Sequence, residues 1–211
     1  MSDSYLKQNF RLCDSKNIGI VLSLEKSPLC DAYLNQPKKQ NFYDLNLYLC
    51  NECGFVQIDT VIEPETIYRD YIYVTTSSPG LRSHFKRYAL DVCDFLNLYQ
   101  SNLTVDIGSN DGTLLNFFKQ QGHKVLGIEP SIKAANSANE NDIETLAEFF
   151  DIDLANTIVN QYGKASLITI NNLFANIDNL NEFTKGINVL LDSNGVLVIE
   201  SSYLIDMIDN M

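Results

Sequence analysis

The sequence contains no tryptophan, only two histidines and few basic residues. Lysine and arginine total 15 against 27 aspartates and glutamates, which gives a formal net charge of −12 at pH 7. A chain this acidic repels phosphate backbones, so we expect no nucleic-acid partner. Two histidines, without a Ser–His–Asp or Cys–His arrangement, also argue against hydrolytic catalysis.

Long apolar runs are absent as well. A membrane-spanning helix needs roughly 18 or more apolar residues in a row, and no segment comes near that length. The N-terminus, MSDSYLKQNFRLCDS, lacks the apolar core of a secretion signal. With 45% hydrophobic and 20% charged residues, the 211-residue chain has the composition of a folded protein. We therefore expect a cytoplasmic protein without membrane contact, made of one domain or of one domain plus a small appendage.

The five cysteines are unevenly distributed along the chain. Four of them lie in the first 53 residues, and two belong to the motif Cys50-Asn-Glu-Cys53-Gly54. An odd number of cysteines in a chain without an export signal favours thiols that are free or bound to metal over disulfides. The fifth, Cys93, is expected to be a small core residue.

The residue pattern divides the chain into three parts. Residues 1–60 are turn-rich, with short strands expected at 19–24 and 45–49. Residues 61–100 form a linker with an amphipathic helix at 81–99. Residues 101–211 alternate strand and helix, which predicts an α/β fold with a parallel sheet covered on both faces. The expected strands are 103–108, 124–129, 143–146, 167–171 and 196–201, and the expected helices are 113–121, 132–139, 151–162 and 180–191.

The most informative segment follows the first of these five strands and is Val105-Asp-Ile-Gly-Ser-Asn-Asp-Gly-Thr113. A dinucleotide site would have glycine rather than Asp106 at the first position of the motif. The carboxylates of Asp106 and Asp111 would repel a pyrophosphate, but they suit a cationic ligand. S-adenosylmethionine, with its sulfonium and ammonium groups, is such a ligand, and Gly108 and Gly112 leave room for its methionine half. A tight strand–helix turn with a solvated acidic residue is the alternative.

Further residues complete the predicted cofactor site. Glu129 ends the second strand, within reach of a ribose hydroxyl pair. Phe150 falls where this fold class packs an adenine ring, although a core aromatic pair is equally consistent with the sequence. Asn171 and Asn172 are interpreted as pocket-lining groups, with plain turn residues as the alternative. The predicted cofactor-binding residues are Asp106, Gly108, Asn110, Asp111, Gly112, Glu129, Phe150, Asn171 and Asn172.

Six segments carry a family resemblance. Those in the α/β part are 105–115, Gly127-Ile-Glu-Pro130 and Asn171-Asn-Leu-Phe-Ala-Asn-Ile-Asp178. Those in the N-terminal third are Ser27-Pro-Leu-Cys-Asp-Ala-Tyr-Leu34, Cys50-Asn-Glu-Cys-Gly-Phe-Val-Gln57 and Asp70-Tyr-Ile-Tyr73. Together they resemble the sugar C-methyltransferases. The resemblance implies a methyltransferase-type Rossmann sheet after a small zinc-binding module, and S-adenosylmethionine-dependent methylation of a carbon in a nucleotide-linked keto-deoxysugar.

The resemblance also implies a zinc site made of two Cys-x-x-Cys pairs. Cys50 and Cys53 form one pair, but the other retains only Cys13, with Phe10 in the place of its partner. Cys30 is a candidate for the fourth ligand, because structural zinc prefers four. A metal-free module with free thiols is the alternative.

Candidate catalytic residues also follow from the resemblance. The resembling enzymes have a histidine in the loop after the fourth strand, and here that position is Asn176, which cannot take up a proton near neutral pH. Tyr71 and Tyr73 match tyrosines that approach the active site, or else they form a packed aromatic stripe. His84 is a candidate from its neighbours rather than from the resemblance. It lies in the basic segment Arg82-Ser-His-Phe-Lys-Arg87, whose arginine forks suit a sugar-nucleotide diphosphate, with a solvated helix face as the alternative.

The family resembled continues past the fifth strand into a segment that supplies the base, whereas this chain ends at Met211. We therefore expect that the 211-residue chain alone does not methylate sugars. The strand at 196–201 would leave an open sheet edge, which favours pairing with a second chain. Two other functions stay open: a non-catalytic S-adenosylmethionine-binding remnant or half of a split enzyme, and an O- or N-methyltransferase of small molecules.

Overall fold

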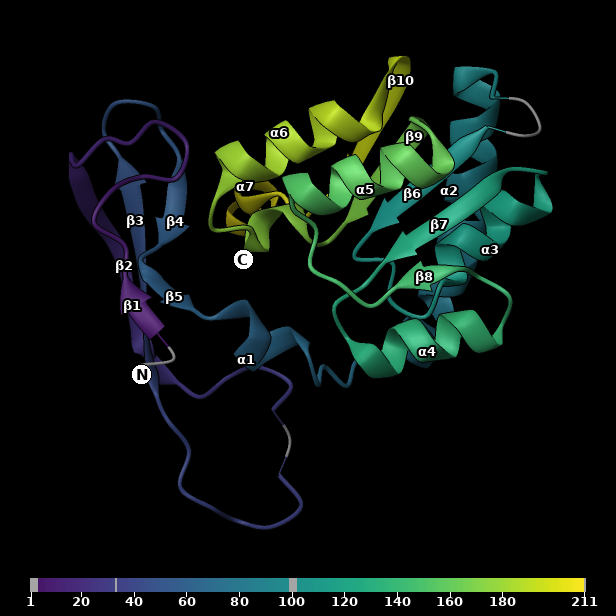
Figure 1. Ribbon diagram of the computed structural model, residues 1–211. Helices are drawn as coiled ribbons and strands as arrows, with labels where there is room; N and C mark the ends of the chain where they lie inside the picture. Colours follow the sequence, from purple (N-terminus) through teal and green to yellow (C-terminus); the bar gives the residue numbers. More distant parts are fainter. Residues whose placement is uncertain (1–3, 33, 99–101, 211) are drawn as a thin grey trace. The chain divides into compact units, whose positions relative to one another are not determined.

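The computed structural model describes residues 4–32, 34–98 and 102–210, which form two compact units (Figure 1). The first unit comprises the described residues up to Tyr73 together with Asp178–Asn181. The second comprises Val74–Ile177 and the described residues from Glu182 onward.

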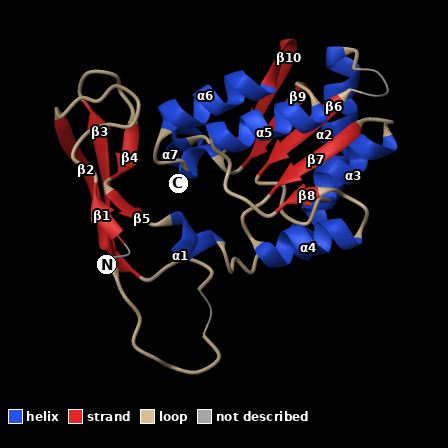
Figure 2. Ribbon diagram, in the orientation of Figure 1, coloured by secondary structure: helices blue, strands red, loops and turns tan. Residues whose placement is uncertain are grey.

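Five parallel strands form the central sheet of the second unit (Figure 2). Their order is β10-β9-β6-β7-β8, so the chain leaves β8 at one edge and returns on the other side of β6. The carboxyl end of β6 is therefore the point where the strand order reverses, and such points bind ligands in α/β sheets. The strands are β6 (Leu103–Ile107), β7 (Lys124–Ile128), β8 (Thr145–Leu146), β9 (Ala165–Asn171) and β10 (Leu191–Glu200). They confirm the predicted parallel sheet.

Helices cover both faces of this sheet, because the side chains of its strands alternate between two apolar clusters. Ile168 and Ile170 of β9 join the cluster packed by α5 and α6, whereas Leu167 joins the cluster packed by α2 and α3. The helices are α2 (Pro79–Leu96), α3 (Thr113–Gln120), α4 (Ile132–Glu140), α5 (Ile152–Tyr162), α6 (Leu180–Leu190) and α7 (Leu204–Asp209). All but α7 were predicted; Tyr99, where the first expected helix ended, lies outside the described residues. Within the described part of the chain, no helix is long and apolar enough to cross a membrane.

The first unit consists of short antiparallel strands. Strand β1 (Ser4–Leu6) pairs with β5 (Thr60–Ile62), and β2 (Ile18–Ser27), β3 (Tyr43–Cys50) and β4 (Val56–Ile58) form a second sheet, followed by α1 (Pro64–Tyr68). β2 and β3 confirm the two expected strands. The other three have only three residues each, too few to show an alternating pattern.

The apolar core of the first unit is small. Phe10 and Cys50 are 0% and 1% exposed, but Ile20 and Leu24 on the edge strand β2 are 60% and 50% exposed. Asp178 adds a polar anchor, since its carboxylate pairs with Lys7 and Arg11 at 2.9 Å each. A unit that buries so little apolar surface usually needs a disulfide or a metal for stability.

Candidate functional site

The turn between β6 and α3 depends on its two glycines. Gly108 and Gly112 have φ angles of 81° and 74°, a conformation that favours glycine. A Cβ atom at Gly112 would also come within 2.9 Å of the Ile143 side chain. The backbone N–H of Asn110 donates to Glu129 Oε2 at 2.9 Å, which ties the turn to the end of β7.

Two buried carboxyl groups lie at the carboxyl ends of β6 and β7. Asp106 is 3% exposed and accepts a hydrogen bond from the Thr169 hydroxyl at 2.7 Å. Burial nevertheless raises the pKa of Asp106 to about 7, and the charge of Glu129 adds to the rise. Burial likewise raises the pKa of Glu129, although the N–H groups of Ser131 and Asn110 favour its charged form. A cationic ligand beside Asp106 would offset both its burial and this repulsion.

Asn110 and Asp111 accept backbone hydrogen bonds from the preceding segment, and Asp111 also binds Thr113 at the start of α3. The Asp111 carboxylate accepts from the Thr113 hydroxyl at 2.6 Å and from the Thr76 N–H at 3.0 Å. The Asn110 side-chain oxygen accepts from the Thr75 N–H at 2.9 Å. Both predicted cofactor residues therefore help to hold the turn in shape.

The predicted residues after β9 have different surroundings. Both polar side-chain atoms of Asn171 are buried and have no hydrogen-bond partner among the described residues. Asn172 has a φ of 55°, and its N–H donates to the Glu200 carbonyl at 2.8 Å. Asn176 is exposed, and its side chain donates to the Asn172 carbonyl at 3.4 Å. Asn171 alone among these asparagines has unused hydrogen-bonding groups in the interior.

Phe150 packs in the apolar core. Its ring meets the Phe183 ring edge-on, with centroids 5.4 Å apart, and it borders the cluster between the sheet and α5 and α6. Phe150 is therefore a core residue that contacts α6, and its packing against an adenine ring stays a prediction.

Tyr71 and Cys30 line a cavity of about 220 Å³ in the first unit. The Tyr71 hydroxyl donates to Asp31 at 2.9 Å, and burial together with that bond raises the pKa of Tyr71. The rings of Tyr71 and Tyr73 lie 6.4 Å apart, so these tyrosines do pack as an aromatic pair.

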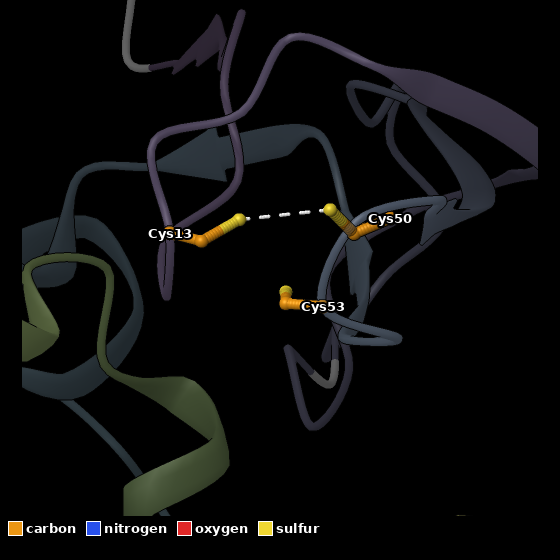
Figure 3. A group of neighbouring side chains, drawn as sticks. All are labelled: Cys13, Cys50 and Cys53. Atoms are coloured by element: carbon orange, nitrogen blue, oxygen red, sulfur yellow. Dashed lines mark hydrogen bonds between the residues drawn. The ribbon is translucent and has the colours of Figure 1, made fainter.

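Three of the four predicted metal ligands come together, as Figure 3 shows. The sulfur atoms of Cys13, Cys50 and Cys53 all lie within 4.8 Å of one another, and Cys13 and Cys50 are 3.6 Å apart. Zinc–sulfur bonds of about 2.3 Å in a tetrahedron place sulfurs roughly 3.8 Å apart, so the three thiols fit a zinc ion. Among the described residues, neither Cys30 nor any other cysteine, histidine or carboxylate belongs to this group.

Two matching turns build the three-thiol group. The N–H of Asp14 donates to the Phe10 carbonyl at 2.9 Å, and the N–H of Gly54 donates to the Cys50 carbonyl at 3.0 Å. Asp14 and Gly54 both have positive φ angles, 58° and 75°. Phe10 and Cys50 therefore occupy equivalent positions, and the fully buried Phe10 ring takes the place of a fourth thiol.

The thiols of this group differ in acidity. Burial opposes ionisation of Cys50, but nearby backbone N–H groups and the other two thiols outweigh it and lower the pKa of Cys50 to about 7. A thiolate is the form that binds metal, so Cys50 is the first ligand available near neutral pH.

His84 pairs with a carboxylate that was not considered in the sequence. Its Nε2 lies 2.6 Å from Glu200 Oε2. Sequence reasoning also missed Thr169, which binds Asp106, and Tyr88, which lies one helical turn after His84. Thr169 and Glu200 could have been noticed as polar residues within or at the end of apolar strands. Tyr88 could have been noticed because it follows His84 by four residues on a helix.

Both units of the chain resemble known proteins. Residues 11–68 match the family described as "Putative zinc binding domain". The C-methyltransferase NovU of Streptomyces niveus is 28% identical over 204 residues, which cover 95% of this chain and 48% of NovU. The chain thus spans about half the length of that relative.

Similar solved structures are more distant in sequence. The PH0226 protein of Pyrococcus horikoshii OT3 has a TM-score of 0.50 and 14% identity, over 65% of this chain and 62% of that one. The plantazolicin methyltransferase BpumL in complex with SAH has a TM-score of 0.46 and 19% identity, over 55% of this chain and 46% of that one. Residues 82–206, more than half of the chain, match the family described as "Methyltransferase domain". The chain therefore belongs to the methyltransferase family.

Proposed function

We propose that the chain binds S-adenosylmethionine and serves the C-methylation of a nucleotide-activated keto-deoxysugar. The main support is the buried Asp106 carboxyl, which forms no ion pair with any cation among the described residues. The ligand's ammonium group would supply that charge. The similarity to NovU, a C-methyltransferase, supports a carbon as the methyl acceptor.

Each residue around the turn has a role in this proposal. Asp106 holds the ammonium group, Glu129 accepts the ribose hydroxyls, and Gly108 and Gly112 keep the turn clear of side chains. The buried Asn171 side chain, which lies beside the Tyr88 hydroxyl, offers further hydrogen bonds. S-adenosylmethionine, when bound, supplies an electrophilic methyl group on sulfur.

The three-thiol group belongs to the same proposal as a structural zinc site. Cys13, Cys50 and Cys53 would hold the ion, which would stabilise a unit with little apolar core. Cys30 remains a proposed fourth ligand only if its loop moves from the cavity that it lines.

A second chain is the proposed partner of β10. Within the described part of the chain, no strand pairs with the outer edge of β10, and Ile199 on this strand is 42% exposed. Sedimentation that shows a concentration-independent monomer would contradict this pairing.

The direct experiment uses S-adenosylmethionine labelled in its methyl group. Where the chain is supplemented with the C-terminal half of a sugar C-methyltransferase, we expect label on a carbon of a nucleotide-linked keto-deoxysugar, and no transfer when the sugar lacks its ketone. Robust transfer by the 211-residue chain alone would contradict the sequence-based expectation that it is inactive by itself. Binding of S-adenosylhomocysteine without any transfer would favour a non-catalytic cofactor-binding protein. Label on oxygen or nitrogen would favour the other methyltransferase classes.

A further inference from the structure

The two turns that carry the three-thiol group match in their backbone and differ in one side chain. The N–H of Cys50 donates to the Phe55 carbonyl, and the N–H of Phe10 donates to the Ser15 carbonyl, each at 2.9 Å. Together with the two bonds described above, these close each turn twice at the same positions. Because Phe10 and Cys50 leave equivalent backbone positions, the Phe10 side chain is directed to the place of a fourth thiol.

Phe10 closes that place to other ligands. Its ring cannot bind a metal, and the residue is 0% exposed, so water does not reach an ion from this side. Gln57 of β4 fastens the residues before and after Phe10. Its Oε1 accepts from the Arg11 N–H at 3.0 Å, and its Nε2 donates to the Asn9 carbonyl at 3.1 Å. The backbone that carries Phe10 is therefore held in place.

The three-thiol group is open to solvent on another side. Cys13 and Cys53 are exposed, whereas Cys50 is buried, so an ion enters the group past the first two thiols. Among the described residues, no further cysteine, histidine or carboxylate adds a ligand atom to the group. An ion bound here has three sulfur ligands from the protein and a hydrocarbon ring where a fourth ligand would stand.

Zinc and copper differ in what they need from such a group. Structural zinc takes four ligands in a closed tetrahedron, so three thiolates and a ring leave it one ligand short. Thiolates also select Cu(I), a soft ion that is satisfied by three sulfur atoms around it in a plane. The three sulfurs lie within 4.8 Å of one another, which leaves room for this planar arrangement.

We propose that Cys13, Cys50 and Cys53 form a three-coordinate site for Cu(I), and that Phe10 sets the preference of the site for this ion over zinc. The site lies in the first unit and is independent of methyl transfer. In the exchange, the three thiolates pass from Zn²⁺ to Cu⁺ without a change of oxidation state, and the zinc ion leaves with its two charges. Occupancy also depends on which metal is available. Zinc therefore fills the group where copper is scarce, and Cu(I) displaces it where copper is supplied.

Metal exchange, measured without oxygen, tests this preference. The full chain carrying one zinc ion is titrated with Cu(I) held by a coloured copper chelator, and a zinc indicator reports the zinc released. We expect one Cu(I) to release one zinc ion. Because thiolates favour Cu(I) in general, the decisive comparison is with Phe10→Cys, which offers zinc a fourth thiolate. The exchange constant should be at least about tenfold larger in the wild type than in Phe10→Cys. Cys30→Ser, which changes a cysteine outside the group, should match the wild type.

X-ray absorption needs no variant, so it tests the proposal even if Phe10→Cys does not fold. We expect three sulfur neighbours around copper in the wild type, and three around zinc before the exchange. Two or four sulfur neighbours around copper, or four around zinc, would overturn the proposal. Equal exchange constants in the wild type and Phe10→Cys, or no zinc release from the wild type, would overturn it as well. None of these results bears on the proposed cofactor site of the second unit, which binding of S-adenosylhomocysteine tests separately.

Discussion

The affinity for S-adenosylhomocysteine should depend on pH through Asp106. The pKa of this buried carboxyl is about 7 in the free protein. At pH 6 about one molecule in eleven then carries the charge, and at pH 7.5 about three in four do. If the ligand's ammonium group binds only the carboxylate, affinity should rise about eightfold over this range, or about 1.2 kcal/mol.

Calorimetry at a series of pH values measures this change, and titrations in two buffers of different ionisation enthalpy report the protons released. We expect about 0.9 proton released per ligand at pH 6, because a mostly protonated Asp106 must ionise on binding. The buried Glu129 also titrates near the site, so Asp106→Asn is the control that isolates Asp106. Asp106→Asn should bind weakly, with a flat profile. The reasoning would be refuted if the affinity of the wild type changed by less than twofold between pH 6 and 7.5. It would also be refuted if the affinity of Asp106→Asn changed with pH as much as that of the wild type.

The remaining predictions concern stability and metal. Elemental analysis of protein purified without chelator should find close to one zinc ion per chain, and Cys53→Ser should lower this zinc content. A zinc content far below one ion per chain in the wild type would mean that the module is metal-free. Phe10→Cys should slow zinc loss to a chelator at least tenfold, since the equivalent turn position then supplies a fourth thiolate; an unchanged rate would contradict the equivalence. Gly112→Ala should lower the free energy of unfolding by about 2–3 kcal/mol in urea titrations, because Gly112 has a positive φ and a Cβ atom there would press on Ile143. Gly80→Ala should leave the free energy of unfolding unchanged, since no atom lies close to the position of its Cβ. Without ligand, stability should fall as pH rises from about 4 to 7, because folding raises the pKa of Asp106 and the unfolded chain then binds fewer protons; Asp106→Asn should flatten this slope.

The sequence predicted the α/β unit well because its strands and helices are marked by local patterns. Buried runs such as Leu103–Ile107 and the glycine turn after it are recognisable without knowing any tertiary contact. The three-residue strands β1, β4 and β5 had no such pattern, since only pairing across the first unit defines them.

Side-chain partners distant in sequence were the part that could not be predicted. His84 and Glu200 are 116 residues apart in sequence, so no local pattern indicates that they pair. The basic residues next to His84 in sequence predicted a phosphate ligand instead. Asp178 joins the first unit through Lys7, 171 residues away, although it follows β9 in the chain. Cys30 was assigned to the metal by residue type alone, and the fold places it in a separate cavity.

We expect the buried carboxyl at the end of β6 to bind a cationic cofactor. Calorimetric titration of the wild type and Asp106→Asn with S-adenosylhomocysteine at pH 7.5, with NADH as the competing ligand, tests it most directly. We predict one S-adenosylhomocysteine per chain, affinity at least tenfold weaker in Asp106→Asn, and no heat from NADH. Binding of NADH in preference to S-adenosylhomocysteine, or equal affinity in the two proteins, would contradict the claim.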